Sequence, residues 1–436
     1  MSDIRSFLDT VSRQIRWKRA RAPLTVELEN HIIDRTESLT ESGISPVEAE
    51  AQAVREMGDP EDIGLALDRV HRPSPNWGLL GCAAALLLSG MALMWALGDR
   101  GTYFQPMLIY SALGIAALIV GYFLDYTLLA GIPGWGIFAV CGVLMYLPIL
   151  GNHFMTAAAQ LCHMLPVLFI PLVYRTRSGE KKDIIVMLAA FIACQLAAGF
   201  SHQWMSLSVY MIVVCGGLVI YAALNGWFRK RTAKTVFGAF APPAAMFALL
   251  CTVSFSSLER RLMEGALFPE DDPMGMGWVA LRVRELIGTS QFIGSGDTSE
   301  LMESFLQPGE LRSVNHLLAV AVHEYGYILL IILGALLCAA GAMLVRGVRR
   351  QSCGLGKLTM LCIGLCFGLR TAFYLLCNLG FTFITFEGIP LFSYCGKLTV
   401  IDMFMLGILL SVFRTESITR DSGIKLRIPS PKSHTA

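Results

Sequence analysis

Apolar residues follow two different patterns along the 436-residue chain. In the first 75 residues they recur every three or four positions among charged residues, which is the period of an amphipathic helix. The first of them are Ile4, Phe7, Leu8, Val11 and Ile15. From residue 76 onward, apolar runs of about 20 residues follow one another, each long enough to cross a bilayer. The pattern predicts an all-α, polytopic membrane protein, with a small helical domain at 1–75, a membrane domain at 76–415 and a tail at 416–436.

Capping signals divide the first domain into four predicted helices. A helix over residues 4–15 precedes one that runs from Pro23 to Glu41. Ser45-Pro46-Val47-Glu48 is a capping box with proline at the first helical position. Asp59-Pro60-Glu61-Asp62 repeats that arrangement and opens the last helix.

Ten apolar runs predict ten membrane spans. They lie near 77–97, 105–124, 127–149, 156–175, 183–200, 205–224, 235–254, 316–345, 358–382 and 397–413. Basic residues gather after the fourth, sixth, eighth and tenth runs, whereas the short loops after the first, third, fifth and ninth contain only Arg100. By the positive-inside rule, both termini are then cytoplasmic and the long loop at 255–314 is outside. That loop is either an ordered cap over the outer face or a substrate-facing groove.

Composition agrees with this division and excludes a single soluble enzyme domain. Residues 1–75 contain 10 Lys and Arg and 14 Asp and Glu, whereas the remaining 361 residues contain 25 and 19. The net charge of +2 gives no support for nucleic-acid binding, because the basic residues form short clusters between apolar runs. The 12 cysteines indicate neither a disulfide framework nor a CxxC metal pair. We expect no cleavable signal peptide before the first apolar run.

Polar residues inside the apolar runs are candidate functional groups, because a polar side chain without a partner is costly in lipid. His323 and Glu324 lie in the eighth run, Arg370 in the ninth and Lys397 at the start of the tenth. Arg370 is either the buried partner of another residue or a contact for a head group. His316 shares a helix face with His323, but their spacing does not fit an HExxH zinc motif, so we predict no metal site.

The first domain resembles the permease-prefix (HAAS-type) helical signalling domain of Gram-positive bacteria. The resemblance rests on Glu27–Ile32, Gly43–Glu50 and Ala53–Pro60. It implies a cytoplasmic regulatory module with a signalling partner, and no chemistry of its own.

The membrane domain resembles the FtsW/RodA/SpoVE (SEDS) family. Gly388–Gly396, which reads GIPLFSYCG, is similar to the family's G-[IV]-P-L-P-F-[IV]-S-Y-G-G signature, and Asn378-Leu379-Gly380 to its N-[IV]-G. Phe292–Gly296 resembles its IGSG segment and Asp272–Gly277 its D-P-x-x-x-G-x-Q segment. Ten spans with a long outer loop before span eight also fit.

The resemblance implies a peptidoglycan glycosyltransferase of cell division or cell shape, in the cytoplasmic membrane of a Gram-positive-type bacterium. Its substrate would be lipid II and its partner a class B penicillin-binding transpeptidase. No cofactor is implied with certainty, and a divalent cation is kept as a candidate. The substrate-binding residues implied are Gly294, Gly296, Arg370, Gly388, Pro390, Ser393, Gly396 and Lys397.

One departure from the family concerns the catalytic base. The family's Asp in H-T-D-F-[IL] falls on Asn315, and an amide cannot take a proton at neutral pH. A working enzyme would then use another base, for which Asp297, Glu310, Glu324 and His316 are the candidates. The alternatives are a non-catalytic regulator or scaffold with the same fold, and a flippase for lipid-linked precursors.

Overall fold

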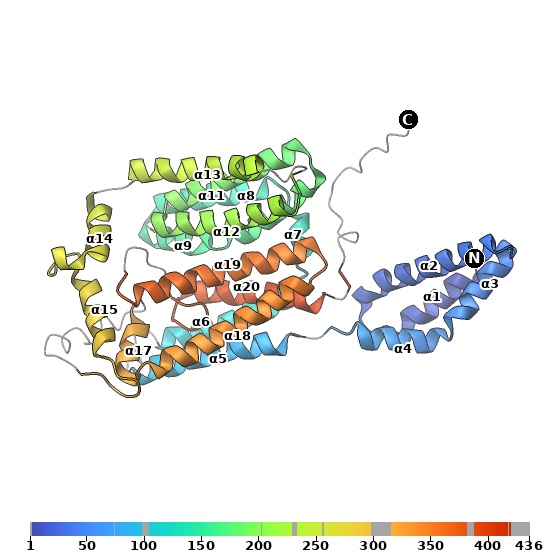
Figure 1. Cartoon of the computed structure of the whole chain (residues 1–436), viewed down its shortest axis with the longest axis horizontal. Coiled ribbons are helices and arrows are strands. Elements are labelled where there is room, and N and C mark those ends of the chain that lie inside the picture. Colours follow the sequence, from blue (N-terminus) through green and yellow to red (C-terminus); the bar gives the residue numbers. More distant parts are fainter. Residues whose placement is uncertain are drawn as a thin grey trace. The chain divides into compact units, whose positions relative to one another are not determined.

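The structure is a computed structural model that describes residues 2–73, 75–97, 104–201, 203–228, 233–254, 257–297, 315–381, 388–416 and 418–419. Within these ranges the chain forms helices and no strand, as predicted (Figure 1). It divides into two compact units. The first, called the head unit here, combines residues 1–75 with 413–424, and the second, the membrane unit, comprises residues 76–412 and 425–436.

The head unit contains the four predicted helices. They are α1 (Ser2–Gln14), α2 (Lys18–Glu41), α3 (Pro46–Met57) and α4 (Pro60–Val70). Both predicted caps are confirmed: the Ser45 hydroxyl accepts a hydrogen bond from the backbone N–H of Glu48, and the Asp59 carboxylate accepts one from that of Glu61. These side chains satisfy N–H groups that have no partner within the helix, so they fix where α3 and α4 begin.

The prediction that the second helix begins at Pro23 is wrong, because α2 begins at Lys18 and contains this proline. A proline there removes one backbone hydrogen bond, which favours a helix start at that residue. The chain on both sides of it is nevertheless packed: Ala20 and Leu24 are buried in the head core, and Arg21 Nε donates to the Ile15 carbonyl. Burial of these residues offsets the lost bond.

The head core is apolar and includes one residue from the other end of the chain. Val11, Ile15 and Ile32 are at most 1% exposed and pack with the small residues Ala49 and Ala53 of α3. Ile418, which follows the last helix of the chain, is 8% exposed within the same cluster. The core of the head unit is therefore completed by a residue that lies more than 340 positions after residue 75.

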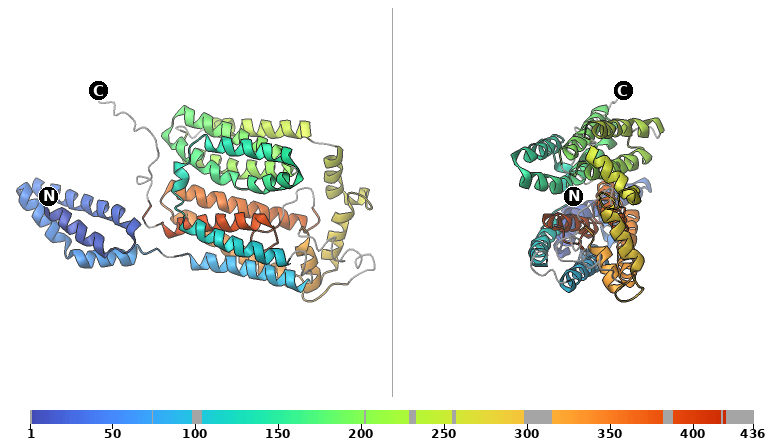
Figure 2. Two further views of the ribbon diagram at one scale, coloured as in Figure 1. Left: turned by 180° about the vertical axis from the view of Figure 1, so that it is seen from behind. Right: turned by 90° about the vertical axis from the view of Figure 1, so that its left-hand side faces the viewer.

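The membrane unit is a bundle of long helices that run along a common direction (Figures 1 and 2). They are α5 (Trp77–Ala96), α6 (Gln105–Phe123), α8 (Gly136–Tyr146), α9 (Asn152–Cys162), α10 (Leu165–Arg175), α11 (Lys181–Gly199), α12 (Trp204–Leu224), α13 (Ala233–Ser254), α18 (Ile328–Arg350), α19 (Gly354–Cys377) and α20 (Lys397–Arg414). Six of the described helices are long and apolar enough to cross a membrane, or seven if α9 and α10, which meet at a bend of 41°, form one span. The count of ten therefore stays a prediction.

α19 lies in the interior of the bundle, where it packs against α10, α12 and α18. α18 in turn packs against α5 and leaves most of its apolar surface outside the protein, as a lipid-facing helix does. α20 approaches α6 very closely: a Cβ atom on Gly407 would lie 2.3 Å from the Leu118 carbonyl oxygen. A small residue at this point is what allows the two backbones to meet.

The two ends of the membrane unit differ. At the end on the right in Figure 1, called the basic end here, α10 and α18 finish and α11 starts, with Arg175, Lys181, Lys182, Arg349 and Arg350. At the opposite end lie α14 (Ser257–Leu267), α15 (Trp278–Thr289) and α17 (Leu317–Tyr325) (Figure 2). We call it the loop end, since the predicted long loop supplies α14 and α15.

The prediction of one continuous span over residues 316–345 is wrong. The run breaks at Gly326, which has a φ of +92°, so that α17 is a separate helix of 9 residues before α18. A Cβ atom at Gly326 would lie 2.6 Å from the Phe292 carbonyl oxygen. Hydropathy alone does not reveal such a break, because both pieces are apolar.

Candidate functional site

The last two turns of α19 connect the motif segments singled out in the sequence. Arg370, Tyr374, Cys377 and Asn378 are spaced by four, three and one positions, so they share one helix face. Each contacts a different segment: Arg370 contacts α20, Tyr374 the Gly388–Gly396 loop, and Cys377 and Asn378 the start of α17. We call these four residues the α19 face.

Asn378 fixes the start of α17 with its side-chain amide. Its Nδ2 donates to the carbonyl oxygens of Asn315 (3.0 Å) and Tyr374 (2.9 Å), and its Oδ1 accepts from the backbone N–H of Ala319 at 2.9 Å. The residue is 2% exposed. A buried amide that uses both ends in this way determines the position of the neighbouring backbone.

Asn315 and His316 stand immediately before α17 in different surroundings. Asn315 is exposed, so the residue at the family's Asp position faces the outside of the protein. His316 is 8% exposed and its Nδ1 lies 3.9 Å from the Cys377 sulfur. Burial lowers the pKa of His316, which lies outside the candidate spans, to about 4. The imidazole is therefore neutral at pH 7 and a weak base.

The IGSG segment lies along the junction of α17 and α18 and is held there by backbone hydrogen bonds. Gly296 N–H donates to the His323 carbonyl (2.8 Å) and Gly294 N–H to that of Tyr325 (3.2 Å). In return, the N–H groups of Tyr327 and Ile328 donate to the carbonyls of Gln291 and Phe292. We call residues 291–296 the strap. Its two predicted glycines serve this pairing, which explains their place in the motif.

Three of the predicted ionisable residues lie near the strap. A Cβ atom on Gly296 would come within 2.7 Å of the His323 ring, which is 1% exposed and has its Nδ1 3.3 Å from the Leu286 carbonyl oxygen. Glu324 is partly exposed, and Asp297, directly after the strap, is exposed. Both carboxylates therefore belong to the loop end. Glu310 lies outside the described residues.

The Gly388–Gly396 loop is a buried turn. Gly388 has a φ of +147°, and a Cβ atom there would lie 2.5 Å from that of Ser393. Ser393 accepts a hydrogen bond from the Ile389 N–H at 3.2 Å and also contacts the Tyr374 hydroxyl. Pro390 is buried, Gly396 is partly exposed and Lys397, at the start of α20, is exposed. Of the residues predicted to bind substrate here, Lys397 is thus the one that presents a charge at the surface.

Arg370 is the buried partner of a carboxylate. Its Nη1 donates to Asp402 Oδ1 of α20, and both side chains are 0% exposed. Nε and Nη2 of Arg370 have no hydrogen-bond partner among the described residues. Of the two interpretations of Arg370 that the sequence allows, the structure shows the buried ion pair.

Sequence reasoning missed four residues of this arrangement, Tyr374, Cys377, Asp402 and Arg284. Asp402 is a lone acid in an apolar run, which is a signal, and Tyr374 lies one helical turn after Arg370. Arg284 of α15 donates to the Ala266 and Gly380 carbonyls and lies 5.3 Å from the ring of Phe381. Nothing in the sequence places this arginine against the end of α19.

No metal centre is formed by the described part of the chain: no three His, Cys, Asp or Glu side chains there are close enough to share an ion. His316 and His323 each face a different neighbour, the Cys377 sulfur and the Leu286 carbonyl. Of the charged residues assigned to the candidate site, Asp297, Glu324 and Lys397 are accessible in the described part of the chain, while the Arg370–Asp402 pair is buried.

Comparisons with known proteins give relatives in sequence and in structure. No family model matches the chain. A protein of Trichlorobacter lovleyi named "Probable peptidoglycan glycosyltransferase FtsW" is 22% identical over 333 residues, which is 72% of this chain and 84% of the relative. The crystal structure of the Thermus thermophilus rod shape determining protein RodA matches with a TM-score of 0.52 at 15% identity, covering 79% of this chain and 98% of RodA.

A further solved structure comes from a report on how a peptidoglycan synthase complex coordinates polymerization and crosslinking. It matches with a TM-score of 0.57 at 17% identity and covers 79% of this chain and 98% of that chain. The chain is a multi-pass membrane protein with the SEDS fold. The resemblance seen in the motifs is thus confirmed at the level of fold, and the α19 face is the part of this SEDS fold that brings the motifs together.

Proposed function

We propose that this chain is a SEDS-type peptidoglycan glycosyltransferase that polymerises lipid II at the loop end of its membrane unit. The observation that carries the proposal is the α19 face, which joins the start of α17 and the Gly388–Gly396 loop at one end of a SEDS fold. The relation to FtsW supports the same activity. The loop end would face outward, with both termini in the cytoplasm.

The residues at the loop end supply part of the chemistry that this reaction needs. The leaving pyrophosphate of a lipid-linked sugar needs a cation, and Lys397 is exposed at the start of α20. The attacking hydroxyl needs a base. α17 has 9 residues, so Asn315 and Glu324 lie about 13 Å apart along it. Asp297 lies beside the Glu324 end, since Gly296 bonds to His323.

This separation gives two distinct catalytic proposals. If Asp297 or Glu324 is the base, the reaction takes place beside the strap rather than beside Asn315. If the reaction takes place beside Asn315, the neighbouring group is His316, whose pKa of about 4 makes it a weak base at pH 7. We favour the two carboxylates, because Asp297 and Glu324 are accessible to an incoming sugar hydroxyl, whereas the His316 ring is buried.

A second candidate function is that of a non-catalytic SEDS regulator. The exposed Asn315 favours it, because the position is accessible but carries no titratable group. If the natural chain is such a regulator, Asn315→Asp should create polymerase activity. The first proposal instead expects the natural chain to be active and Asp297→Asn or Glu324→Gln to abolish that activity.

The test is polymerisation of lipid II by the purified full-length chain in liposomes. We expect glycan polymer from the natural chain and a loss of roughly 10²–10⁴-fold for the variant that removes the base. Asn225→Asp, at an exposed asparagine after α12, is the matched control for Asn315→Asp. No polymer from the natural chain, with polymer from Asn315→Asp, supports the regulator. Transport of the precursor without polymer from either chain would support a flippase.

The head unit would act as a permease-prefix type of regulatory module. Ile418 supports this role, because it packs in the head core and follows α20 by a few residues of chain. A change in the head core would then act on the end of α20, the helix that carries Asp402 and begins with Lys397. We further propose a transpeptidase as partner of the membrane unit, as the match to a polymerising and crosslinking complex suggests.

A further inference from the structure

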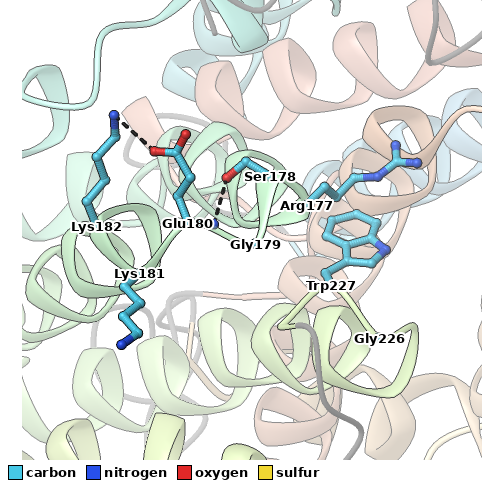
Figure 3. Close-up of a pocket in the computed structure, with 8 residues that line it drawn as sticks. All are labelled: Arg177, Ser178, Gly179, Glu180, Lys181, Lys182, Gly226 and Trp227. Carbon is cyan, nitrogen blue, oxygen red and sulfur yellow. Dashed lines mark hydrogen bonds and ion pairs between the residues drawn. The ribbon is translucent and has the colours of Figure 1, made fainter. Parts of the chain in front are cut away.

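At the basic end, a pocket opens between the end of α10, the start of α11 and the end of α12 (Figure 3). Its volume is about 540 Å³. Its lining includes three basic residues, Arg177, Lys181 and Lys182, and the aromatic residue Trp227. α19 starts at the basic end, and the α19 face begins at Arg370, 16 residues later and about 24 Å along the helix, so this pocket does not belong to the site described above.

An aromatic cluster holds one of these cations in place. The Trp227 ring packs edge-on against Tyr174 and Tyr221, with ring centroids 6.0 Å apart in both pairs. The Arg177 guanidinium lies 5.2 Å from the Trp227 ring and 5.4 Å from that of Tyr174. Stacking on two rings orders this exposed arginine, so less conformational entropy is lost when it binds a ligand.

The charge of the lining favours an anion. The lining contains three cations, Arg177, Lys181 and Lys182, and one carboxylate, Glu180, which lies 3.0 Å from the Lys182 ammonium. The nearby carboxylate of Asp183 accepts a hydrogen bond from Ser178 at 2.7 Å. The four charged residues of the lining therefore carry a formal charge of +2, with Lys181 outside the Lys182–Glu180 pair.

The position of the pocket indicates where the anion comes from. α11 and α12 are both candidate spans, so their ends at this pocket lie at the depth of the lipid head groups. Tryptophan and tyrosine gather at that depth, and basic pockets between membrane helices bind anionic head groups there. Trp227 provides an apolar wall beside the cations, which suits a phosphodiester joined to glycerol better than a free ion.

We propose that this pocket binds the head group of an anionic phospholipid through its phosphate, with Arg177 and Lys181 as the main contacts. The inference does not depend on the proposed enzymatic activity, because the pocket lies at the other end of the bundle. Bound lipid would link the ends of α10, α11 and α12 and so stabilise the membrane unit.

The test is thermal unfolding of the full-length chain in a neutral detergent with three separate additives. They are a short-chain phosphatidylglycerol, the matching phosphatidylcholine and inorganic phosphate. We expect phosphatidylglycerol alone to raise the midpoint of unfolding, with saturation. Lys181→Gln should weaken its apparent affinity about fivefold, since a lysine at an anionic surface contributes about 1 kcal/mol.

Arg350→Gln is the control, because it removes an exposed cation of the basic end that does not line the pocket. It should leave the response to phosphatidylglycerol unchanged. Three outcomes would overturn the proposal. The first is an equal effect of phosphatidylcholine, and the second is an equal effect of inorganic phosphate, which would indicate a site for free anions. The third is an equal loss of affinity in Lys181→Gln and Arg350→Gln. If Lys181→Gln folds poorly, Arg177→Gln is tested instead. Bound phosphatidylglycerol is then counted by native mass spectrometry, and a twofold or greater loss is expected.

Discussion

The head unit and the membrane unit place their polar side chains in opposite ways. In the head, Ser45 and Asp59 cap helices at the surface, and the core consists of apolar residues such as Val11 and Ile32. In the membrane unit, Arg370, Asp402 and Asn378 are in the interior: the Arg370–Asp402 pair joins α19 to α20, and Asn378 joins the end of α19 to the start of α17. Water solvates a polar group at the surface of the head, whereas lipid cannot, so polar groups of a membrane bundle are satisfied inside it.

This difference has a consequence for stability. A surface cap in the head can be replaced by water at a small cost. A buried polar contact in the bundle has no such replacement, and its loss leaves the partner without compensation. The contacts of the α19 face should therefore be far more sensitive to substitution than the caps of the head.

The largest effect is expected at the Arg370–Asp402 pair. Asp402→Leu should destabilise the membrane unit by about 3–5 kcal/mol, because it leaves a buried guanidinium without its carboxylate. The double variant Arg370→Leu/Asp402→Leu should regain most of this loss, since neither charge then remains. Thermal unfolding of the purified chain measures both. A double variant as unstable as the single one would mean that the pair acts through shape rather than charge.

A smaller effect is expected at Asn378. Asn378→Ala removes three hydrogen bonds and leaves the Ala319 N–H and the Asn315 carbonyl unpaired, which should cost about 2–3 kcal/mol. Hydrogen exchange should rise at the start of α17 and stay unchanged in α11. Asn152→Ala, at the start of α9, is the control. Faster exchange spread evenly over the bundle would contradict a local role for Asn378.

The third effect tests whether the chain after α20 is part of the head. Ile418→Ala should lower the free energy of unfolding of the head unit by about 1–2 kcal/mol. This is less than the same substitution costs at a fully buried isoleucine, because Ile418 lies at the edge of the core with 8% of its surface exposed. Hydrogen exchange of the full-length chain should increase in α1 and α2. The neighbouring Thr419→Ala serves as the control. Equal hydrogen exchange in the two variants would show that Ile418 does not stabilise the head core.

Sequence reasoning predicted the local features of both units and missed the contacts between distant segments. The caps at Ser45 and Asp59 were predicted because a cap is decided within four residues. The break at Gly326 was missed, because it depends on Phe292, which is far away in the sequence. The motif residues Gly294, Gly388 and Asn378 were found, but their joining by the α19 face was not, because Tyr374 and Asp402 carry no motif of their own.

The smallest effect is expected at the Ser45 cap. This substitution tests, in the head unit, whether a surface polar contact is as easily replaced by water as we infer. Ser45→Ala should cost about 0.5–1 kcal/mol, because the hydroxyl is exposed and water can replace it at the Glu48 N–H. Hydrogen exchange at the first turn of α3 should increase while the rest of the head stays protected. Ser6→Ala, at an exposed position of α1, should change nothing. A loss at Ser45 as large as that at Asn378 would show that the head, too, depends on polar contacts which water cannot replace.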